Sequence, residues 1–375
     1  MDSAATGRHG TSRPAFASAI PVLALVLLLG VVLSISPARA AGAGTTLGLY
    51  PGPASPSGVE SFSAWLGAPV GYAEDFVPGD NWSTIENPAW LLNMWKGKPY
   101  RVVFGVPLIP GSGGSLAQGA AGAYNVHFKT LAQNLVAAGL GNAVLRLGWE
   151  FGGGWYPWAV KNATDAANYA AYWRQVVTTM RSVAPNLAFD WNPIWGSQPV
   201  DPAAAYPGDA YVTYIGVDVY DQSWASGWQD PVKRWAGFLS AQWGLQWHRD
   251  FAAAHGKQMT FPEWGLSIRS DGHGGGDNPY FIKMMHEWIG QNDVAYAIYF
   301  DFDSSDGKHS LENGQFPNAR AAFKEVFGAG QPSPAPAAQP APAAQPSPPP
   351  VQSPSPAPAP QHHPVHKTRH DASRR

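Results

Sequence analysis

The sequence predicts an α/β fold, a (β/α)8 barrel in which eight parallel strands alternate with helices. Eight short segments rich in β-branched and aromatic residues alternate with helical patterns, as the buried strands of a parallel sheet do. Eight repeats are the number that closes such a sheet into a barrel. The alternative is an open doubly wound sheet, which usually has a Gly-rich phosphate loop after its first strand. Residues 49–53 (LYPGP) occupy that place and lack the pattern.

The predicted strands and helices follow in order along the globular region. The strands are TLGLY (46–50), PVGYAEDF (69–76), YRVVFGVPL (100–108), NAVLRLGWE (142–150), LAFDWNP (187–193), YIGVDVY (214–220), QMTFPEWG (258–265) and AYAIYFDFD (295–303). Helices are expected over 126–141, 165–183, 232–256, 278–290 and 318–328. Capping signals support them, with Asp165 at the cap of the second, Pro279 in a first turn and Gly141 at an end.

The N-terminal segment resembles a secretory signal peptide. Arg8 and Arg13 precede an apolar run from Ala19 to Leu33, and a small-residue cleavage site ends at Ala40. An uncleaved membrane anchor is the alternative, but the run is short for a spanning helix, which needs about 20 apolar residues. We therefore expect a signal peptide over residues 1–40 and a protein that is secreted, periplasmic or at the cell surface, with a membrane contact only if the signal is uncleaved.

The C-terminal segment, residues 331–375, consists largely of Pro, Ala, Gln and Ser and ends in a His-rich, basic stretch. Such a composition cannot bury a core, so a disordered, extended spacer is expected. Its basic end is either a solvated tail or a contact with an anionic surface or a polysaccharide. Between the two ends, residues 41–330 have the composition of one globular domain, and we expect it to be a monomer.

Composition excludes several kinds of chemistry. The chain has no Cys, which excludes disulfides, thiol catalysis and zinc–thiolate sites, and its net charge of -2 gives no support for a nucleic-acid partner. Asp301, Asp303 and Glu312 have part of the spacing of a calcium loop, but the Gly arrives one residue late at Gly307. Neither a metal nor another cofactor is expected. The 17 Trp exceed what a core of this size requires, so some should line a groove.

Acidic and aromatic side chains stand where the predicted strands end, and barrel active sites lie at those ends. Glu150 ends the fourth strand between Trp149 and Phe151, and Glu263 lies in the seventh strand beside Trp264. An ionised carboxylate is costly to bury among aromatic rings without a partner or a function. Further polar and aromatic residues stand at other strand ends, namely Asp190, Asn192, Trp195, Asp218, Tyr220, Asp221, Asp301 and Asp303.

Two carboxyl groups in an aromatic cleft suit the hydrolysis of a glycosidic bond. One must be protonated to assist the leaving oxygen, and the other must be ionised to attack the anomeric carbon. Apolar walls favour the protonated form of the first, while hydrogen-bond donors favour the ionised form of the second. Glu150 and Glu263 form the best pair by this reasoning. For Glu150 alone, the alternative is a buried ion pair with Arg146.

These residues make the sequence resemble glycoside hydrolase family 26, the β-mannanase family of retaining (β/α)8 glycosidases, over most of residues 41–330. The family's strand-four signature places an Arg before the acid/base Glu and then a Gly and two Trp, which match Arg146, Glu150, Gly153, Trp155 and Trp158. Its strand-seven nucleophile, followed closely by Gly, and its strand-six Tyr correspond to Glu263, Gly265 and Tyr220.

The resemblance implies a retaining double displacement, with Glu150 as acid/base and Glu263 as nucleophile, their carboxyl groups about 5 to 5.5 Å apart. Arg146 and Tyr220 would hold Glu263, and Asn192 would line or support the site. The expected sugar-stacking residues are Trp149, Trp155, Trp158, Trp195 and Trp264, with Trp224 and Trp228 at an outer subsite. His273 and His309 lie in loops on the same face.

Two positions depart from the family pattern. Trp149 stands where the family usually has a His, and the eighth strand reads YFDFD where a Trp is common. The binding subsites should therefore differ from those of typical members. The hypothesis is an exported endo-β-glycanase acting on a β-mannan or a related β-glucan. The alternatives are a carbohydrate-binding protein with little or no catalysis and, with only Arg146 to serve acidic sugars, a polysaccharide lyase.

Overall fold

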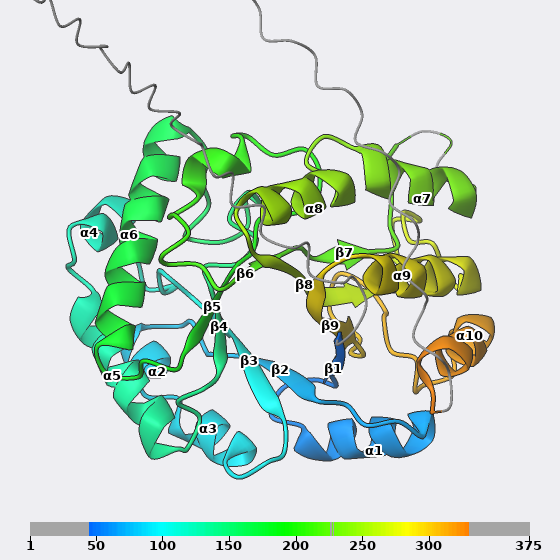
Figure 1. Ribbon diagram of the computed structural model, residues 1–375, viewed down its shortest axis with the longest axis horizontal. Helices are drawn as coiled ribbons and strands as arrows, with labels where there is room; N and C mark the ends of the chain where they lie inside the picture. Colours follow the sequence, from blue (N-terminus) through cyan, green and yellow to red (C-terminus); the bar gives the residue numbers. More distant parts are fainter. Residues whose placement is uncertain (1–44, 226, 228, 330–375) are drawn as a thin grey trace, which may run out of the picture.

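The computed structural model describes residues 45–225, 227 and 229–329. In this part of the chain nine strands form one parallel sheet in the order β6-β5-β4-β3-β2-β1-β9-β8-β7, and a pairing between β6 and β8 closes it. Figure 1 shows the strands at the centre with helices around them. The predicted (β/α)8 barrel is confirmed. The strands are β1 (Thr46–Tyr50), β2 (Tyr72–Phe76), β3 (Arg101–Val106), β4 (Val144–Leu147), β5 (Ala188–Trp191), β6 (Tyr214–Gly216), β7 (Val219–Tyr220), β8 (Gln258–Gly265) and β9 (Val294–Phe300).

Strands β6 and β7 together occupy one of the eight barrel positions. β6 pairs with Gln258–Thr260 at the start of β8, and β7 pairs with Trp264 and Gly265 at its end. The single strand predicted over 214–220 is therefore interrupted between Gly216 and Val219. The interruption contains Asp218, whose side chain turns into the barrel, as described below.

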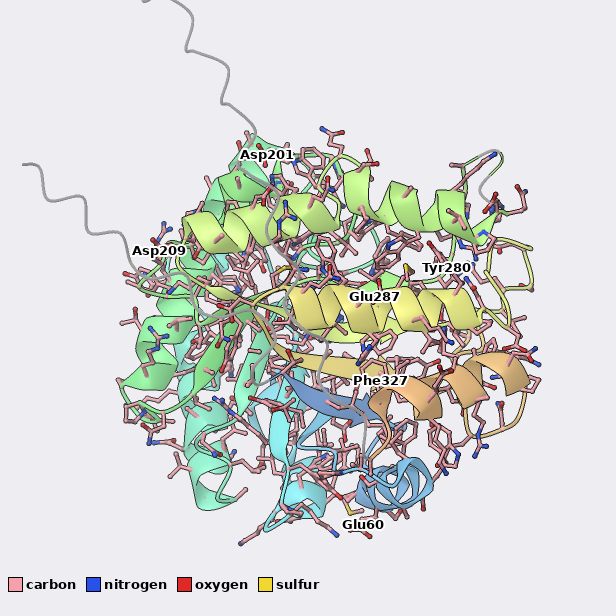
Figure 2. The ribbon with its side chains drawn as sticks, turned by 45° about the vertical axis from the view of Figure 1, so that its right-hand side comes forward. Glu60, Asp201, Asp209, Tyr280, Glu287 and Phe327 are labelled. Carbon is pink, nitrogen blue, oxygen red and sulfur yellow. The ribbon has the colours of Figure 1, made fainter. Side chains whose placement is uncertain are left out.

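The helices form the outer layer. They are α1 (Pro56–Leu66), α2 (Trp82–Glu86), α3 (Ala89–Trp95), α4 (Leu116–Ala120), α5 (Asn125–Ala137), α6 (Ala163–Arg181), η1 (Pro202–Ala205), α7 (Pro231–Ser240), α8 (Leu245–Ala254), α9 (Pro279–Gln291) and α10 (Pro317–Phe327). Figure 2 shows Glu60 on α1 and Glu287 on α9 directed away from the barrel, as expected of amphipathic helices.

Two helix predictions are wrong in detail. The single helix predicted over 232–256 is two helices, α7 and α8, because the chain turns at Trp243 (φ 52°) and Gly244. A Cβ at Gly244 would lie 2.8 Å from the carbonyl oxygen of Phe238, so this turn requires glycine. The cap of α6 is Asn162, whose side chain accepts a hydrogen bond from the Asp165 backbone, so Asp165 lies in the first turn and is not the cap.

Strand alternation separates two apolar layers. Residues on the inner face fill the barrel, and these are Tyr50, Val103, Val144, Ala188, Tyr296, Ile298 and Phe300. Their neighbours along each strand face the helices and form the larger core, in which Trp95, Trp173, Trp191 and Trp264 are almost fully buried. Charged residues that share the inner face, such as Glu74 and Arg146, are therefore enclosed by the barrel.

The predicted signal peptide and tail lie outside the described residues. No helix in the described part of the chain combines the length and the apolar character that crossing a membrane would require.

Candidate active site

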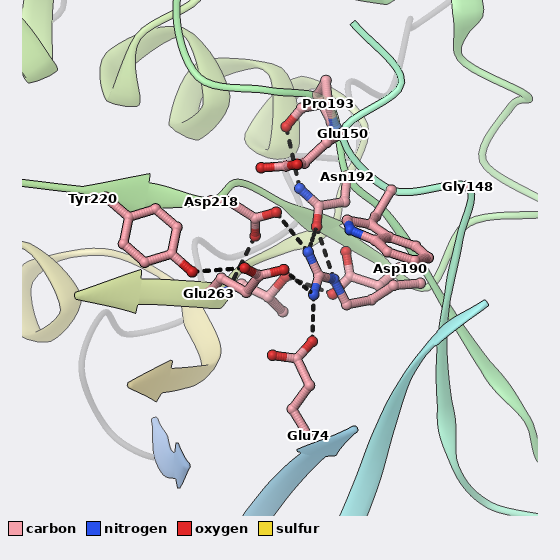
Figure 3. Close-up of polar contacts among 12 residues, drawn as sticks. Glu74, Gly148, Glu150, Asp190, Asn192, Pro193, Asp218, Tyr220 and Glu263 are labelled. Atoms are coloured by element: carbon pink, nitrogen blue, oxygen red, sulfur yellow. Dashed lines mark hydrogen bonds and ion pairs between the residues drawn. The ribbon is translucent and has the colours of Figure 1, made fainter. Parts of the chain in front are cut away.

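Arg146 lies at the centre of a group of acidic side chains inside the barrel. The side chain is fully buried on β4 and forms ion pairs with Glu74 of β2, with Asp218 at 2.6 Å and with Glu263 of β8 at 2.8 Å. Its Nε also donates to Oδ1 of Asn192 at 2.9 Å. Figure 3 shows these four partners around one guanidinium group. Since Arg146 pairs with three carboxylates, it is not an ion-pair partner dedicated to Glu150.

A bulge in β8 sets the direction of Glu263. Phe261 pairs with Ala297 of β9, and Trp264 pairs with Tyr299. Between these two pairs β8 has one more residue than β9, which is a β-bulge. As a result Glu263 faces the barrel interior and its neighbour Trp264 faces the helices. Glu263 Oε1 accepts from Arg146, and Oε2 accepts from the Tyr220 hydroxyl at 2.7 Å. Both carboxylate oxygens are thereby fixed in position, and the side chain is 10 % exposed.

Glu150 follows the end of β4 in a backbone conformation that is rare for a residue with a side chain, with φ of 52°. Its backbone N–H donates to the carbonyl oxygen of Asn192 at 2.7 Å, which ties the two strand ends together. Figure 3 shows Glu150 and Glu263 within one group of polar side chains; Glu150 follows β4, and Glu263 lies on β8.

The surroundings of Glu150 favour its protonated form. Burial, and next the negative charge of Glu263, raise the pKa of Glu150 to about 8, although Arg146 and a hydrogen bond from Trp155 act in the opposite direction. Trp155 Nε1 donates to Glu150 Oε2 at 3.2 Å. Gly153 permits this contact, because a Cβ there would lie 2.3 Å from the Trp155 ring. A carboxyl with a pKa near 8 can serve as a general acid at neutral pH.

Aromatic rings form the wall beside Glu150. Trp149 packs on Phe76, Tyr156 and Trp158 at ring-centroid distances of 5.3, 4.9 and 4.9 Å. Tyr156 stacks on Trp158 at 4.4 Å, and the Trp158 Nε1 donates to the Trp149 carbonyl. Trp149 and Trp158 are almost completely buried, so they support the wall and offer little surface to a sugar. Tyr156 is half-buried, and burial, followed by the charges of Glu150 and Glu263, raises its pKa.

The other predicted stacking residues differ in position. Trp155 is 62 % exposed beside Glu150, where a sugar ring can reach it. Trp195 is partly buried, donates to the Phe238 carbonyl and packs on the Phe238 ring. Trp264 is fully buried between β8 and the helices, stacked on Phe323. The expectation that Trp264 contacts sugar is therefore wrong, because successive strand residues point to opposite faces. Trp228 lies outside the described residues.

Two residues of this site, Glu74 and Tyr156, were not singled out from the sequence. Glu74 contacts Arg146 together with Asp218, which was expected at a strand end, and burial raises the pKa of both carboxyl groups well above the usual range. Oε2 of Glu74 has no hydrogen-bond partner within the described chain, so Arg146 is the only partner found there for this buried carboxyl group. The signal for Glu74 was its position in an otherwise apolar strand, YAEDF, and that for Tyr156 its position between Trp155 and Trp158.

The acidic residues after β9 organise a loop. Asp303 accepts hydrogen bonds from the backbones of His309 and Ser310, and Asp301 accepts one from Leu311. His309 is buried and packs on the Tyr220 ring at 4.9 Å. Over residues 45–225, 227 and 229–329 no three His, Cys, Asp or Glu side chains are arranged to hold a metal ion.

Comparison with known sequences gives a match to the family described as glycosyl hydrolase family 26, over residues 127–242. The matched region contains Arg146, Glu150, Asn192 and Tyr220 and ends before Glu263. Endoglucanase H of Acetivibrio thermocellus is 26% identical over an alignment of 343 residues, which covers 84% of this chain and 34% of that protein. A mannan endo-1,4-beta-mannosidase of Bifidobacterium adolescentis is 27% identical over 159 residues, 40% of this chain and 15% of that protein. The chain thus spans about a third or less of the length of these relatives.

Solved structures share the barrel. GH26C of Muricauda sp. MAR_2010_75 superposes with a TM-score of 0.55 at 18% identity, over 76% of this chain and 85% of that one. A Cellulomonas fimi endo-beta-1,4-mannanase gives 0.56 at 18% identity, over 76% and 72%, and Bacillus subtilis mannanase man26 gives 0.52 at 13% identity, over 78% and 88%. At these identities the structures establish the fold. Together with the sequence match, they confirm the predicted resemblance to glycoside hydrolase family 26.

Proposed function

We propose that this chain, with its match to glycoside hydrolase family 26, hydrolyses internal β-linkages of a β-mannan or a related β-glucan with retention of configuration. The observation that carries the proposal is the contrast between two carboxyl groups at one end of the barrel. Glu150 lies beside aromatic rings and has a raised pKa, while Glu263 accepts hydrogen bonds from a guanidinium and a phenol. One is suited to give a proton and the other to attack carbon.

In the first step, an oxygen of the Glu263 carboxylate attacks the anomeric carbon and the bond to the leaving oxygen breaks. The Glu150 carboxyl transfers its proton to that oxygen. In the second step, ionised Glu150 takes a proton from water, which attacks the anomeric carbon and releases Glu263 as a carboxylate. Arg146 and Tyr220 each bind one oxygen of Glu263, which leaves lone pairs free for the attack.

The charges of the site favour a neutral sugar. Arg146 is fully buried and bound to three carboxylates, so it cannot pair with the carboxylate of an acidic sugar. This argues against the polysaccharide lyase considered from the sequence. The names of the relatives include both an endoglucanase and an endo-mannosidase, and Trp149 replaces the usual family His, so both glycans remain as substrates to test. From the sequence of residues 1–40 we further propose that the protein is exported, and from its single-domain composition that it acts as a monomer.

The test is the release of reducing sugar from β-mannan, mixed-linkage β-glucan and β-xylan. The proteins compared are wild type, Glu150→Ala, Glu263→Ala and the control Glu287→Ala, which removes an exposed carboxyl on α9. We expect release from one of the first two polymers, lost about 10³-fold or more in both site variants and kept in the control. The anomeric configuration of the first product, followed by NMR, checks retention.

Two outcomes would contradict the proposal. Binding of a polymer by wild type without release would favour the alternative of a carbohydrate-binding protein. Release of reducing sugar that persists in Glu263→Ala would show that Glu263 is not the nucleophile.

A further inference from the structure

Trp224 is held on the rim of the barrel with most of its indole exposed. It is 58 % exposed and lies in the loop that follows β7. Its ring stacks on the ring of His273 at 5.5 Å with an interplanar angle of 21°, and the Arg269 guanidinium lies 5.2 Å from the ring centroid. The indole is therefore in contact with an aromatic ring and a cation and still presents more than half of its surface to solvent.

Three loops at the carboxyl ends of neighbouring strands fix this ring. An antiparallel bridge joins Gln222 to Gly274, and another joins Ile268 to Lys308. The loops after β7, β8 and β9 are thus connected by backbone pairing. Ser223 and His273 add a reciprocal pair of bonds, in which the Ser223 N–H donates to the His273 carbonyl at 2.8 Å and the His273 Nδ1 lies 2.7 Å from the Ser223 carbonyl.

Arg269 connects the same three loops through its side chain. It contacts Gln222 after β7 at 3.4 Å, Asp271 in its own loop at 3.0 Å and Asp306 after β9 at 3.4 Å. Because two carboxylates already pair with this guanidinium, Arg269 is not free to bind an anionic ligand. A neutral ring with apolar C–H faces is the ligand that this surface fits, since it can stack on the indole without leaving a charge unpaired.

The rim lies within reach of the two glutamates. Tyr220 donates a hydrogen bond to Glu263, and Trp224 comes shortly after it in the sequence. Even a fully extended chain between them would place their Cα atoms at most about 14 Å apart. From the third loop, the charge of Asp306 acts on Glu150. A few linked pyranose rings cover such a distance, so one glycan chain can occupy the site and the rim together.

We propose that Trp224, braced by His273 and Arg269, is the platform of an outer subsite that binds a further neutral pyranose ring of the polysaccharide chain. The inference rests on the proposed function, because it assigns the substrate of that same site. It requires that long oligosaccharides bind more tightly than short ones through a residue that lies outside the catalytic group.

The test measures binding without turnover. In a Glu263→Gln background, isothermal titration calorimetry compares Trp224→Ala, Trp224→Phe and the unaltered rim, with tri- and hexasaccharides of β-1,4-mannan and of mixed-linkage β-glucan as ligands. Trp90→Ala is the matched control, because Trp90 is 56 % exposed on α3, on the outside of the helical layer. Thermal unfolding of each variant verifies that it is folded.

We expect Trp224→Ala to weaken hexasaccharide binding roughly three- to tenfold. Trp224→Phe should retain part of the hexasaccharide affinity. The trisaccharide should bind with the same affinity to all of the variants and to the protein with the unaltered rim. Equal hexasaccharide affinity in Trp224→Ala and Trp90→Ala would overturn the platform. So would the absence of any hexasaccharide binding. Neither result decides the proposed function, which is judged by reducing-sugar release from the polymers by wild-type protein.

Discussion

Arg146 binds the proposed nucleophile Glu263 and the buried Glu74 through the same nitrogen, Nη1. Glu263 is at 2.8 Å, and the second guanidinium nitrogen, Nη2, pairs with Asp218 at 2.6 Å. One fully buried cation therefore serves three carboxyl groups, and any change in one partner alters the electrostatic environment of the others.

Replacing Arg146 should destabilise the protein and abolish its activity. Arg146→Met leaves Glu74 and Asp218 buried without a cation, which costs about 3–5 kcal/mol in the free energy of unfolding. In the double variant Glu74→Gln/Arg146→Met one of these carboxyl groups is absent. Its loss of stability should therefore be smaller than the sum of the losses in Glu74→Gln and Arg146→Met. Urea unfolding of wild type, the two single variants and the double variant measures these losses. Additive losses would show that the two side chains are energetically independent.

The pH dependence of activity should report Glu150. With a pKa of about 8, the general acid is protonated at neutral pH, and kcat/KM should fall as the pH rises through 8. The hydrogen bond from Trp155 lowers this pKa, so Trp155→Phe should raise it and move the alkaline limb to higher pH. Trp90→Phe should leave the limb in place. A shift of the Trp155→Phe profile to lower pH would contradict the assignment of the limb to Glu150.

The backbone at Glu150 should store strain that glycine relieves. A residue with a Cβ at φ of 52° costs about 1–2 kcal/mol relative to glycine. Both Glu150→Gly and Glu150→Ala remove the carboxyl, so their difference isolates the backbone. Glu150→Gly should be the more stable of the two by about 1 kcal/mol in chemical denaturation. An alanine variant of equal or greater stability would show that the backbone here is unstrained.

His248 should make the protein sensitive to acid. It is fully buried in α8, neither ring nitrogen has a partner in the described part of the chain, and burial lowers its pKa to about 3. The unfolded chain, with a His pKa near 6.5, binds the proton first. The contribution of the neutral ring is therefore complete above pH 6.5 and is lost as the pH falls from 6.5 towards 3.

His248→Leu removes this dependence. Relative to wild type, the variant should gain about 2 kcal/mol more stability at pH 5 than at pH 7.5. Thermal or urea unfolding at the two pH values measures the difference. An equal effect at both would mean that the pKa of His248 is the same in the folded and the unfolded protein.

Part of the site could be predicted because it depends on position along the chain. Glu150 and Glu263 end or nearly end strands, and parallel strands of a barrel end on the same side, so the sequence brings both glutamates to one face. Arg146 lies four residues before Glu150, on β4, and its side chain points into the barrel. Glu74 was missed because its role comes from Arg146, which is distant in sequence.

The tryptophans show where sequence reasoning failed. Trp264 was expected to contact sugar because it adjoins Glu263, yet adjacency along a strand places two side chains on opposite faces. The bulge in β8 decides which of the two faces inward, and a bulge depends on the pairing with β9. Trp155 and Trp158 likewise differ in exposure. Trp158 is buried and stacks on Tyr156, whereas Trp155 is exposed.

The sequence by itself determined the barrel, the order of its elements and the face on which the two glutamates stand, because strand composition and helix periodicity are local properties. Only the tertiary structure decided the partners of Arg146, the inward direction of Glu263 and the bracing of Trp224. Each of these depends on contacts between residues that are far apart along the chain and are brought together when the barrel closes.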